Sequence, residues 1–142
     1  MFATSSGPVM VANVFGTPLL ATNLIPPGDN SYSSKDVFIH KYLRRRATGE
    51  YLNAQEIVTP PLRIMQSPRG FSDRDLEVID NTPDEIRDAA EEMMMRLEGT
   101  FHMTDQDKAD LSRYREMNDY PGISSRSTVA TSFLRRHRFL VE

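Results

Sequence analysis

The sequence predicts an α/β fold with a short parallel sheet, long loops and C-terminal helices. Three observations support this prediction. The most apolar stretch, residues 9–25, divides into a helix-like run and a strand-like run. Prolines and glycines then fall at positions 26–28, 49, 60–61, 68 and 70, and two well-capped helices follow residue 80. Residues 1–142 therefore form a single predicted domain, with an N-terminal unit at 1–24, a loop-rich part at 25–80 and a helical part at 81–142.

The N-terminal unit is predicted to begin with a strand, a turn and a helix. Met1–Thr4 suits the end of a buried strand, and Ser5-Ser6-Gly7 suits a turn. Pro8 fits the first position of a helix, where its missing N–H has no partner to lose. The helix contains a single polar residue before Gly16, so we expect it to be buried nearly all round and to end at this glycine.

A second predicted strand follows this helix. Leu19–Asn23 is a short apolar run of the kind found in parallel strands that are covered on both faces. Such a strand, helix, strand unit needs further parallel strands beside it, and no later segment clearly offers one. We therefore expect a sheet of two obvious strands with an exposed edge.

Only short elements fit between residues 25 and 80, because prolines and glycines interrupt the chain. Residues 34–43 suit a brief strand or a helical turn. Residues 53–58 suit one or two helical turns, in which Asn53 is the N-cap and Glu56 is its capping-box partner.

The clearest predicted helix begins after Thr82. Thr82 suits the N-cap, Pro83 the first helical position and Glu85 the capping-box partner. Apolar residues recur every three or four positions from Ile86 onward and form one stripe, and Gly99 ends the helix.

Two further elements are predicted near the C-terminus. A helix begins after Thr104, with Asp107 as its capping-box partner, and ends before Tyr120-Pro121-Gly122. Residues 129–141 place apolar residues among arginines, which suits a last amphipathic helix or a short strand that docks on the domain.

The basic residues form two clusters, Arg44-Arg45-Arg46 and residues 135–138, in a chain with a net charge of −3. This net charge argues against general nucleic-acid binding. Each cluster either binds an anionic ligand or forms a solvated face that is offset by the acidic helix at 84–98. We favour the solvated face, because neither cluster has the interleaved aromatic residues that stack on bases.

Several kinds of site and location are excluded or not expected. The absence of cysteine excludes disulfides, zinc thiolates and cysteine nucleophiles. His40, His102 and His137 have no partner at a metal-ligand spacing, so we expect no metal and no cofactor. No apolar run reaches the roughly 18 to 20 residues of a membrane span. No basic leader precedes the apolar stretch, so we expect neither a signal peptide nor a membrane span, and a cytoplasmic location.

The turn Ser5-Ser6-Gly7 is the candidate binding site. A turn that leaves a strand and enters a helix presents free backbone N–H groups and hydroxyls near the positive end of the helix dipole, which suits a phosphate or diphosphate. Its place is favourable, since open α/β sheets bind ligands beyond the carboxyl ends of their strands. On chemistry alone, an ordinary capped turn is an equal alternative.

Residues 11–21, VANVFGTPLLA, resemble the helix, G-x-P turn and strand of the nucleotide-sugar domain in GT-B glycosyltransferases and the related sugar-nucleotide epimerases. In those families this helix follows the loop that contacts the donor diphosphate. The likeness extends over most of the chain to a bacterial glycosyltransferase family linked to surface carbohydrates, through SKDVFIHK at 34–41, YLNAQEI at 51–57 and NTPDEI at 81–86. It implies a partial Rossmann-like fold, that of a GT-B C-terminal domain.

The resemblance also implies which residues bind the donor. Backbone amides and hydroxyls would contact the diphosphate in a segment of four residues: Thr4, Ser5, Ser6 and Gly7. Lys35 and Lys41 are weaker candidates for a phosphate or sugar-acid contact, because a solvated lysine is the commoner state. The catalytic residues are unknown.

Two departures from the family pattern limit the implied activity. Many retaining members carry acidic residues at the places that Val11 and Ala3 occupy here, so we do not expect retaining chemistry of that type. GT-B enzymes also use a cleft between two Rossmann-like domains, and this sequence lacks the N-terminal one. We therefore expect an incomplete domain, a fragment that keeps part of a donor pocket and does not transfer sugar by itself.

Two functions from different classes stay open. The first is the donor-binding portion of a glycosyltransferase, which transfers a sugar from a nucleotide diphosphate sugar to a surface-carbohydrate acceptor. The second is a non-catalytic helical interaction module, whose acidic helix and basic tail pair with another chain. An epimerase would share the binding physics of the first, but we identify no acid or base residues for it. Nucleotide binding separates the first two.

Overall fold

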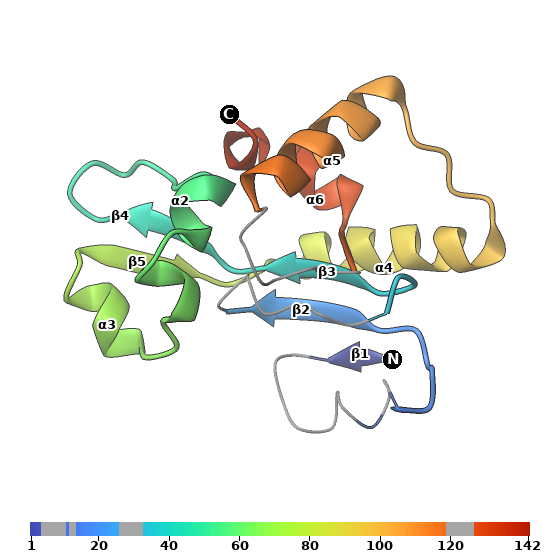
Figure 1. Cartoon of the computed structure of the whole chain (residues 1–142), viewed down its shortest axis with the longest axis horizontal. Helices are drawn as coiled ribbons and strands as arrows, with labels where there is room; N and C mark the ends of the chain where they lie inside the picture. The colour runs from blue at the N-terminus through green and yellow to red at the C-terminus, as the bar shows by residue number, and fades with distance from the viewer. Residues whose placement is uncertain (4–10, 12–13, 26–32, 119–126) are drawn as a thin grey trace.

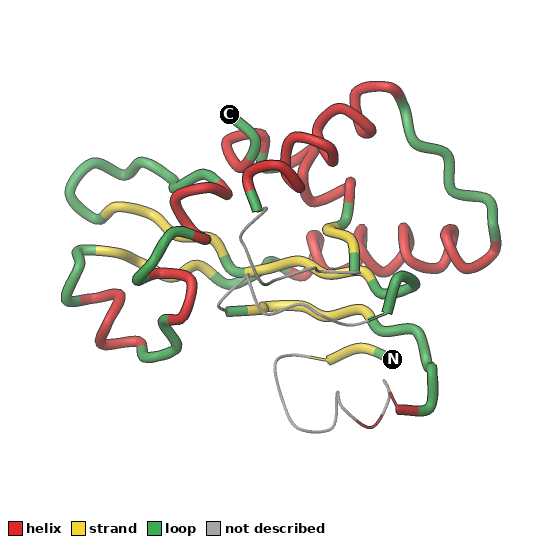
Figure 2. The backbone as a smooth tube through the Cα atoms, viewed as in Figure 1, coloured by secondary structure: helices red, strands yellow, loops and turns green. Residues whose placement is uncertain are grey.

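The computed structural model describes residues 1–3, 11, 14–25, 33–118 and 127–142. At its centre is a parallel sheet of four strands in the order β1-β2-β3-β6 (Figure 1). The strands are β1 (Phe2–Ala3), β2 (Leu20–Leu24), β3 (Val37–His40) and β6 (Thr128–Val129). The N-terminus lies beside β1, and the C-terminus lies across the sheet from it (Figures 1 and 2).

The sheet is larger than the sequence predicted. β2 confirms the second predicted strand and is buried along most of its length. The expectation that no later segment offers a parallel strand is wrong, because β3 pairs with β2 and β6 pairs with β3. β6 has two residues, which is too short to show an alternating pattern, and β3 is buried at every position, so it has no polar face to reveal a period of two.

A second, smaller unit lies beyond the carboxyl ends of the parallel strands. After β3 a single residue, Lys41, leads into β4 (Tyr42–Arg45), which pairs in antiparallel fashion with β5 (Leu76–Ile79). Three short helices connect these two strands: α2 (Ala54–Val58), η1 (Leu62–Ile64) and α3 (Pro68–Ser72). The arrows of β1, β2 and β3 in Figure 1 point toward this unit.

Helices complete the fold: α4 (Pro83–Glu98), α5 (Asp105–Met117), α6 (Thr131–Arg136) and the 3₁₀ turn η2 (Arg138–Leu140). α4 packs against β2 and β3, and α6 packs against α4 and α5. The predicted capping boxes at the starts of α2, α4 and α5 are all confirmed. Gly99 ends α4 with a φ of +73°, as predicted.

Some apolar residues that the pattern predicted to be buried are exposed. Val11, Val14 and Phe15 have exposed fractions of 57%, 81% and 79%, which contradicts a helix buried nearly all round. On α4 the predicted stripe is buried or partly buried except at Met94 and Leu97. An apolar pattern shows which side chains favour burial, but only a neighbouring element can cover them, and in the described structure these five face outward.

The C-terminal segment closes the core. The ring of Phe133 lies 5.4 Å from that of His40, 6.4 Å from that of Tyr42 and 4.7 Å from that of His137, measured between centroids. Phe133 is 1% exposed. The segment predicted as a last helix or strand therefore contains both, and it supplies the ring around which other aromatic side chains pack.

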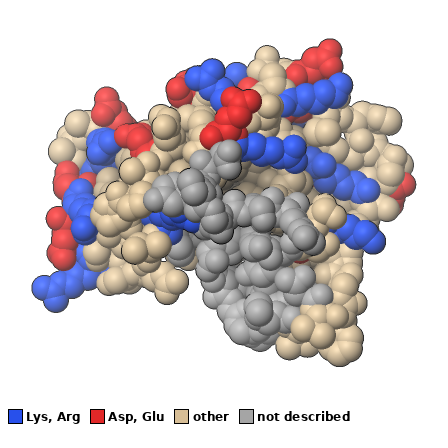
Figure 3. All heavy atoms as spheres, viewed as in Figure 1, with Lys and Arg blue, Asp and Glu red and all other residues tan. Residues whose placement is uncertain are grey.

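Both basic clusters form ion pairs within the chain. The pairs are Arg44 with Glu77, Arg45 with Glu56, Arg135 with Asp107, Arg136 with Asp88 and Arg138 with Asp110. Basic and acidic side chains lie side by side along the upper border of the face in Figure 3. The acidic partners of the C-terminal cluster lie on α5 as well as on α4. The positive charges of the C-terminal segment are therefore paired with negative charges on these two helices.

Candidate ligand site at the carboxyl edge of the parallel sheet

The path of the chain brings four segments to the carboxyl edge of the sheet. β4 leaves this edge after Lys41, and β5 returns to it because the two strands are antiparallel, with Tyr42 opposite Ile79. The residues that follow β5 therefore arrive beside the end of β3. α4 begins there, and β2 ends there because Leu24 pairs with His40; β1 runs toward the same edge and ends in register with Ala21.

Two asparagines join the end of β2 to the start of α4. The backbone N–H of Asn23 donates to Oδ1 of Asn81 at 2.7 Å, and the N–H of Asn81 donates to Oδ1 of Asn23 at 2.7 Å. Nδ2 of Asn81 also donates to the carbonyl of His40 at 2.9 Å. Asn23 has a φ of +53°, a left-handed conformation that asparagine tolerates better than most residues. This pair fixes the relative positions of β2, β3 and α4.

A lysine supplies positive charge at the same edge. Nζ of Lys41 lies 2.6 Å from Oδ1 of Asp80, and its backbone N–H donates to the carbonyl of Leu24 at 3.0 Å. The Lys41 side chain is 25% exposed, whereas that of Asp80 is 71% exposed. An ammonium group carries three N–H donors, so Lys41 can bind an anion while it keeps its contact with Asp80.

His40, the last residue of β3, lies just beneath this edge. Its contacts indicate a structural role. Its ring stacks on Tyr114 at 6.0 Å, and its Nδ1 lies 2.7 Å from the carbonyl of Lys41. Since a carbonyl only accepts, Nδ1 carries the proton and Nε2 is the unprotonated nitrogen. Nε2 is buried without a hydrogen-bond partner among the described residues. Burial lowers the pKa of His40 from 6.5 to about 4, so the ring is neutral at pH 7. It cannot touch a ligand, because it is 1% exposed.

The N-terminus of α4 is already occupied. The Thr82 hydroxyl accepts from the backbone N–H of Glu85 at 3.3 Å, and the Glu85 carboxylate accepts from that of Thr82 at 2.7 Å. Glu85 also bonds Nε2 of His137, and Asp84 adds a second carboxylate to the first turn. These acids already satisfy the positive end of the helix dipole, so α4 offers no seat for an anionic ligand.

The predicted site residues fall at different places. Thr4, Ser5, Ser6 and Gly7 lie outside the described residues; they follow Ala3, which ends β1 in register with Ala21, three residues before β2 ends at Leu24. Lys35 is exposed and lies two residues before β3 begins, at the amino edge. Lys41 directly follows β3. The structure therefore separates the two lysines by the length of β3, about 13 Å for four residues.

The sequence pattern did not predict the residues that organise this edge. Asn23 and Asn81 each stand next to an element boundary, one at the end of an apolar strand and one before a helix cap. This position could have indicated that they bond to the backbone, since polar side chains at strand ends and helix caps often do so. Their pairing over 58 positions of sequence could not be read from it, because it depends on the β4–β5 excursion.

The described residues contain neither a metal-binding cluster nor a membrane-spanning helix. No group of three or more histidine, cysteine, aspartate or glutamate side chains in this part of the chain could hold a metal ion. Across the same ranges, every helix is too short or too polar to cross a membrane. No protein-family model, curated protein or solved structure matches the sequence or the fold.

Proposed function

We propose that this chain is the donor-binding portion of a GT-B-like glycosyltransferase, which takes a nucleotide diphosphate sugar as donor for a surface-carbohydrate acceptor. One observation carries the proposal: in the parallel order β1-β2-β3-β6 the strands point toward one edge, where Leu24 at the end of β2 pairs with His40 at the end of β3. Ligands of open α/β sheets bind at this edge. The segment resembling a diphosphate loop follows β1 directly, so it leaves the sheet on the side where binding is expected.

The order of the segments at this edge suggests which residues would bind which part of the donor. Thr4–Gly7 would contact the diphosphate through backbone amides, and Lys41 would neutralise part of its charge from the end of β3. Asn23 and Asn81 hold β2 and α4 in place and so position Lys41 indirectly. Because the first turn of α4 is filled by its own acids, the loop after β1 is the better candidate for the anion.

The proposal assigns donor binding to this chain and leaves transfer to a larger assembly. The described residues of the site are Lys41, two asparagines and the exposed Asp80, whose carboxylate is engaged in an ion pair with Lys41. The exposed side chains of Val11, Val14 and Phe15 follow edge strand β1 in the chain. Apolar exposure of this kind favours contact with a further folded unit, which in a GT-B enzyme would be the N-terminal domain.

A thermal-shift titration with UDP, GDP and their sugars tests this proposal. A ligand present at 100 times its dissociation constant stabilises the folded state by about 2.7 kcal/mol, so one nucleotide should raise the Tm by several degrees. Gly7→Asp should abolish this rise, because it adds a carboxylate to the segment proposed to contact the phosphate. His102→Asp is the matched control, since it adds the same charge to the exposed loop at the far end of α4.

Two results would contradict the proposal. The first is a cooperative melt that no nucleotide moves, which would favour the interaction-module alternative. The second is a nucleotide shift that Gly7→Asp and His102→Asp leave equally intact, which would place binding away from the loop after β1. Lys41→Gln then gives a finer measure: about a tenfold loss of affinity is expected from removing one charge-assisted hydrogen bond.

A further inference from the structure

A pocket of about 370 Å³ lies on the β4–β5 unit, away from the residues assigned to the donor. It is bounded by α2, by the segment between α2 and η1, and by the start of β5. Its apolar lining comes from five residues: Leu52, Pro60, Pro61, Leu62 and Leu76. A volume of this size is in the range of small-molecule sites, and the combination of apolar walls with a few polar groups is typical of them.

Most polar groups of the pocket already have partners. Nη2 of Arg45 donates to Oε1 of Glu56 at 2.7 Å, and Oε2 of Glu56 accepts from the backbone N–H of Asn53 at 2.9 Å. The Thr59 hydroxyl donates to the carbonyl of Gln55 at 2.7 Å. This side of the pocket is therefore close to neutral, because the charge of Arg45 is paired with that of Glu56.

Arg74 is the exception. Its Nη1 donates to the carbonyl of Gly70 at 3.1 Å, and no carboxylate within the described ranges lies within ion-pair distance of it. The flanking acids point elsewhere, since Asp73 faces Arg69 and Asp75 accepts from the N–H of Ala47. A guanidinium has five N–H donors, so most of those of Arg74 stay available.

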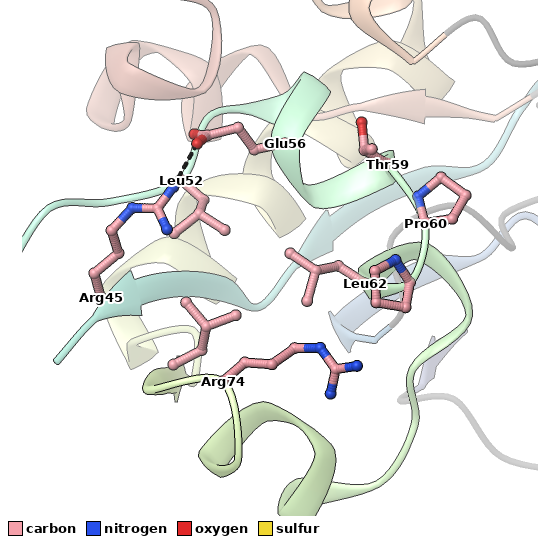
Figure 4. A pocket seen from close by; sticks show the side chains of 9 residues that line it. Arg45, Leu52, Glu56, Thr59, Pro60, Leu62 and Arg74 are labelled. Carbon is pink, nitrogen blue, oxygen red and sulfur yellow. Dashed lines mark hydrogen bonds and ion pairs between the residues drawn. The ribbon is translucent and has the colours of Figure 1, made fainter.

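The close-up view shows how this cation meets the apolar wall. In Figure 4 the Arg74 side chain extends along one side of the pocket, with its guanidinium toward Leu62, while the Arg45–Glu56 pair lies on the opposite side. The planar guanidinium and the Pro60 and Leu62 side chains thus border the same space. A ligand that fills it meets a hydrogen-bonding fork at one end and apolar carbon along its length.

We propose that this pocket binds a small carboxylate with a flat apolar body. The carboxylate would accept two parallel hydrogen bonds from the Arg74 fork, a geometry that a guanidinium matches better than an ammonium. The body would pack against Pro60 and Leu62. The inference goes beyond the donor site, because it uses neither the loop after β1 nor Lys41, and it holds whether or not the chain binds nucleotides.

An NMR titration of the whole chain with benzoate tests this inference. Saturable shifts are expected for the backbone amides of Leu52, Glu56, Leu62 and Leu76. Benzamide has the same shape without the charge, and it should bind about 10-fold or more weakly, which corresponds to the loss of a charge-assisted pair. Because this comparison uses the unaltered chain, it does not depend on the folding of any variant.

Variants locate the carboxylate. Arg74→Gln should weaken benzoate binding about 10-fold, and Arg74→Lys should weaken it less, because a point charge remains without the fork. Arg69→Gln is the matched control; Arg69 lies on α3, its side chain is 89% exposed, and its loss should leave the affinity within about twofold.

Three results would overturn the inference: no shift of the pocket amides with benzoate, equal binding of benzoate and benzamide, or unchanged binding by Arg74→Gln. Equal competition by inorganic phosphate would also overturn it, since the pocket would then recognise charge without the apolar body. If UDP or GDP shifts other amides but not these, the inference about the pocket stands, and the result concerns the donor site alone.

Discussion

The two edges of the parallel sheet differ in how they are covered. At the β6 edge, Val129, Ala130 and Phe133 are all buried, and ion pairs tie the C-terminal segment to α4 and α5. At the β1 edge, Val14 and Phe15 are among the most exposed large apolar side chains of the described structure. We call these the β6 side and the β1 side.

The difference shows that apolar sequence does not locate the core by itself. The β1 side has the most apolar run of the chain, yet its described side chains between Val11 and Phe15 face outward. The β6 side is a basic tail in sequence, yet its Phe133 side chain is only 1% exposed. An apolar side chain is buried only when a neighbouring element of matching shape and charge covers it. On the β6 side, α4 and α5 are these elements. On the β1 side, the side chains of Val11, Val14 and Phe15 stay exposed in the described structure.

The largest expected effect comes from truncating a phenylalanine side chain to alanine on each of the two sides. Phe133→Ala should destabilise the fold by about 4 kcal/mol, because it leaves a cavity among His40, Tyr42 and His137. Phe15→Ala should change the free energy of unfolding by less than about 0.5 kcal/mol, because that ring is exposed. Urea denaturation of both variants measures the contrast. Similar losses in the two would mean that Phe15 is buried in solution, and the two sides would not differ.

The second effect is acid sensitivity on the β6 side, where His40 is enclosed by rings. Its pKa is about 4 in the folded state, mainly because of burial, and near 6.5 when unfolded. The unfolded chain therefore binds the proton first as the pH falls. Stability is full above pH 6.5 and is lost between pH 6.5 and 4, by about 3 kcal/mol in total.

His40→Gln isolates this dependence, because glutamine does not titrate and its amide can still donate to the carbonyl of Lys41. Its unfolding free energy, measured from pH 7.5 to 4.5, should vary less with pH than that of the wild type. His102→Gln is the control, since His102 is exposed in the loop before α5. Equal slopes for the wild type and His40→Gln would show that His40 titrates normally and that this side is open to water.

A buried carboxylate gives the third effect. Glu92 accepts from the backbone N–H groups of Thr131 and Ser132 at 2.9 and 2.7 Å and from Nε of Arg96 at 2.9 Å. Glu92→Ala leaves these donors without their acceptor and should cost about 2 to 3 kcal/mol. Glu91→Ala, its exposed neighbour, should cost less than about 0.5 kcal/mol by the same denaturation measurement. A small loss for Glu92→Ala would mean that α6 docks through packing and not through this acceptor.

Local signals in the sequence predicted the local features of the fold. The capping boxes of α2, α4 and α5 were predictable because each lies within four consecutive residues, and so was the left-handed Gly16, with a φ of +65°. β6 and the β4–β5 pairing were not, because they depend on contacts between residues far apart in the chain.

The candidate site likewise has one part that local sequence predicts and another that depends on long-range contacts. A binding turn after the first strand follows from local order, and it stays a prediction because the turn lies outside the described residues. The pairing of Asn23 with Asn81 and the position of Arg74 in a pocket with Pro60, without a carboxylate partner among the described residues, depend on tertiary structure. Sequence spacing carries no information on which distant backbone a side chain will reach, or on which arginine will lack an acid.

The smallest expected effect tests whether charge helps to close the β6 side. Nε and Nη2 of Arg135 donate to the two carboxylate oxygens of Asp107 at 2.7 and 2.5 Å, and the backbone N–H of Thr104 donates to the same carboxylate at 2.8 Å. These bonds, chiefly those from Arg135, hold the pKa of Asp107 well below its usual range. Because a lowered carboxyl pKa stabilises the fold above the unfolded value, near 3.9, this contribution is present at pH 7 and is lost as the pH falls below about 4.

Single variants cannot isolate the pair, since Asp107 also caps α5. A double-mutant cycle of Arg135→Ala and Asp107→Ala should give a coupling of about 1 to 2 kcal/mol at pH 7, because Asp107 is buried while Arg135 is half exposed and partly screened. The coupling should shrink at pH 3, where the unfolded chain takes up the proton. A coupling near zero at pH 7 would mean that the basic tail is held by its apolar residues alone. The two sides would then differ only in whether their aromatic side chains pack against a neighbouring element. The charges would set only the orientation in which the tail docks.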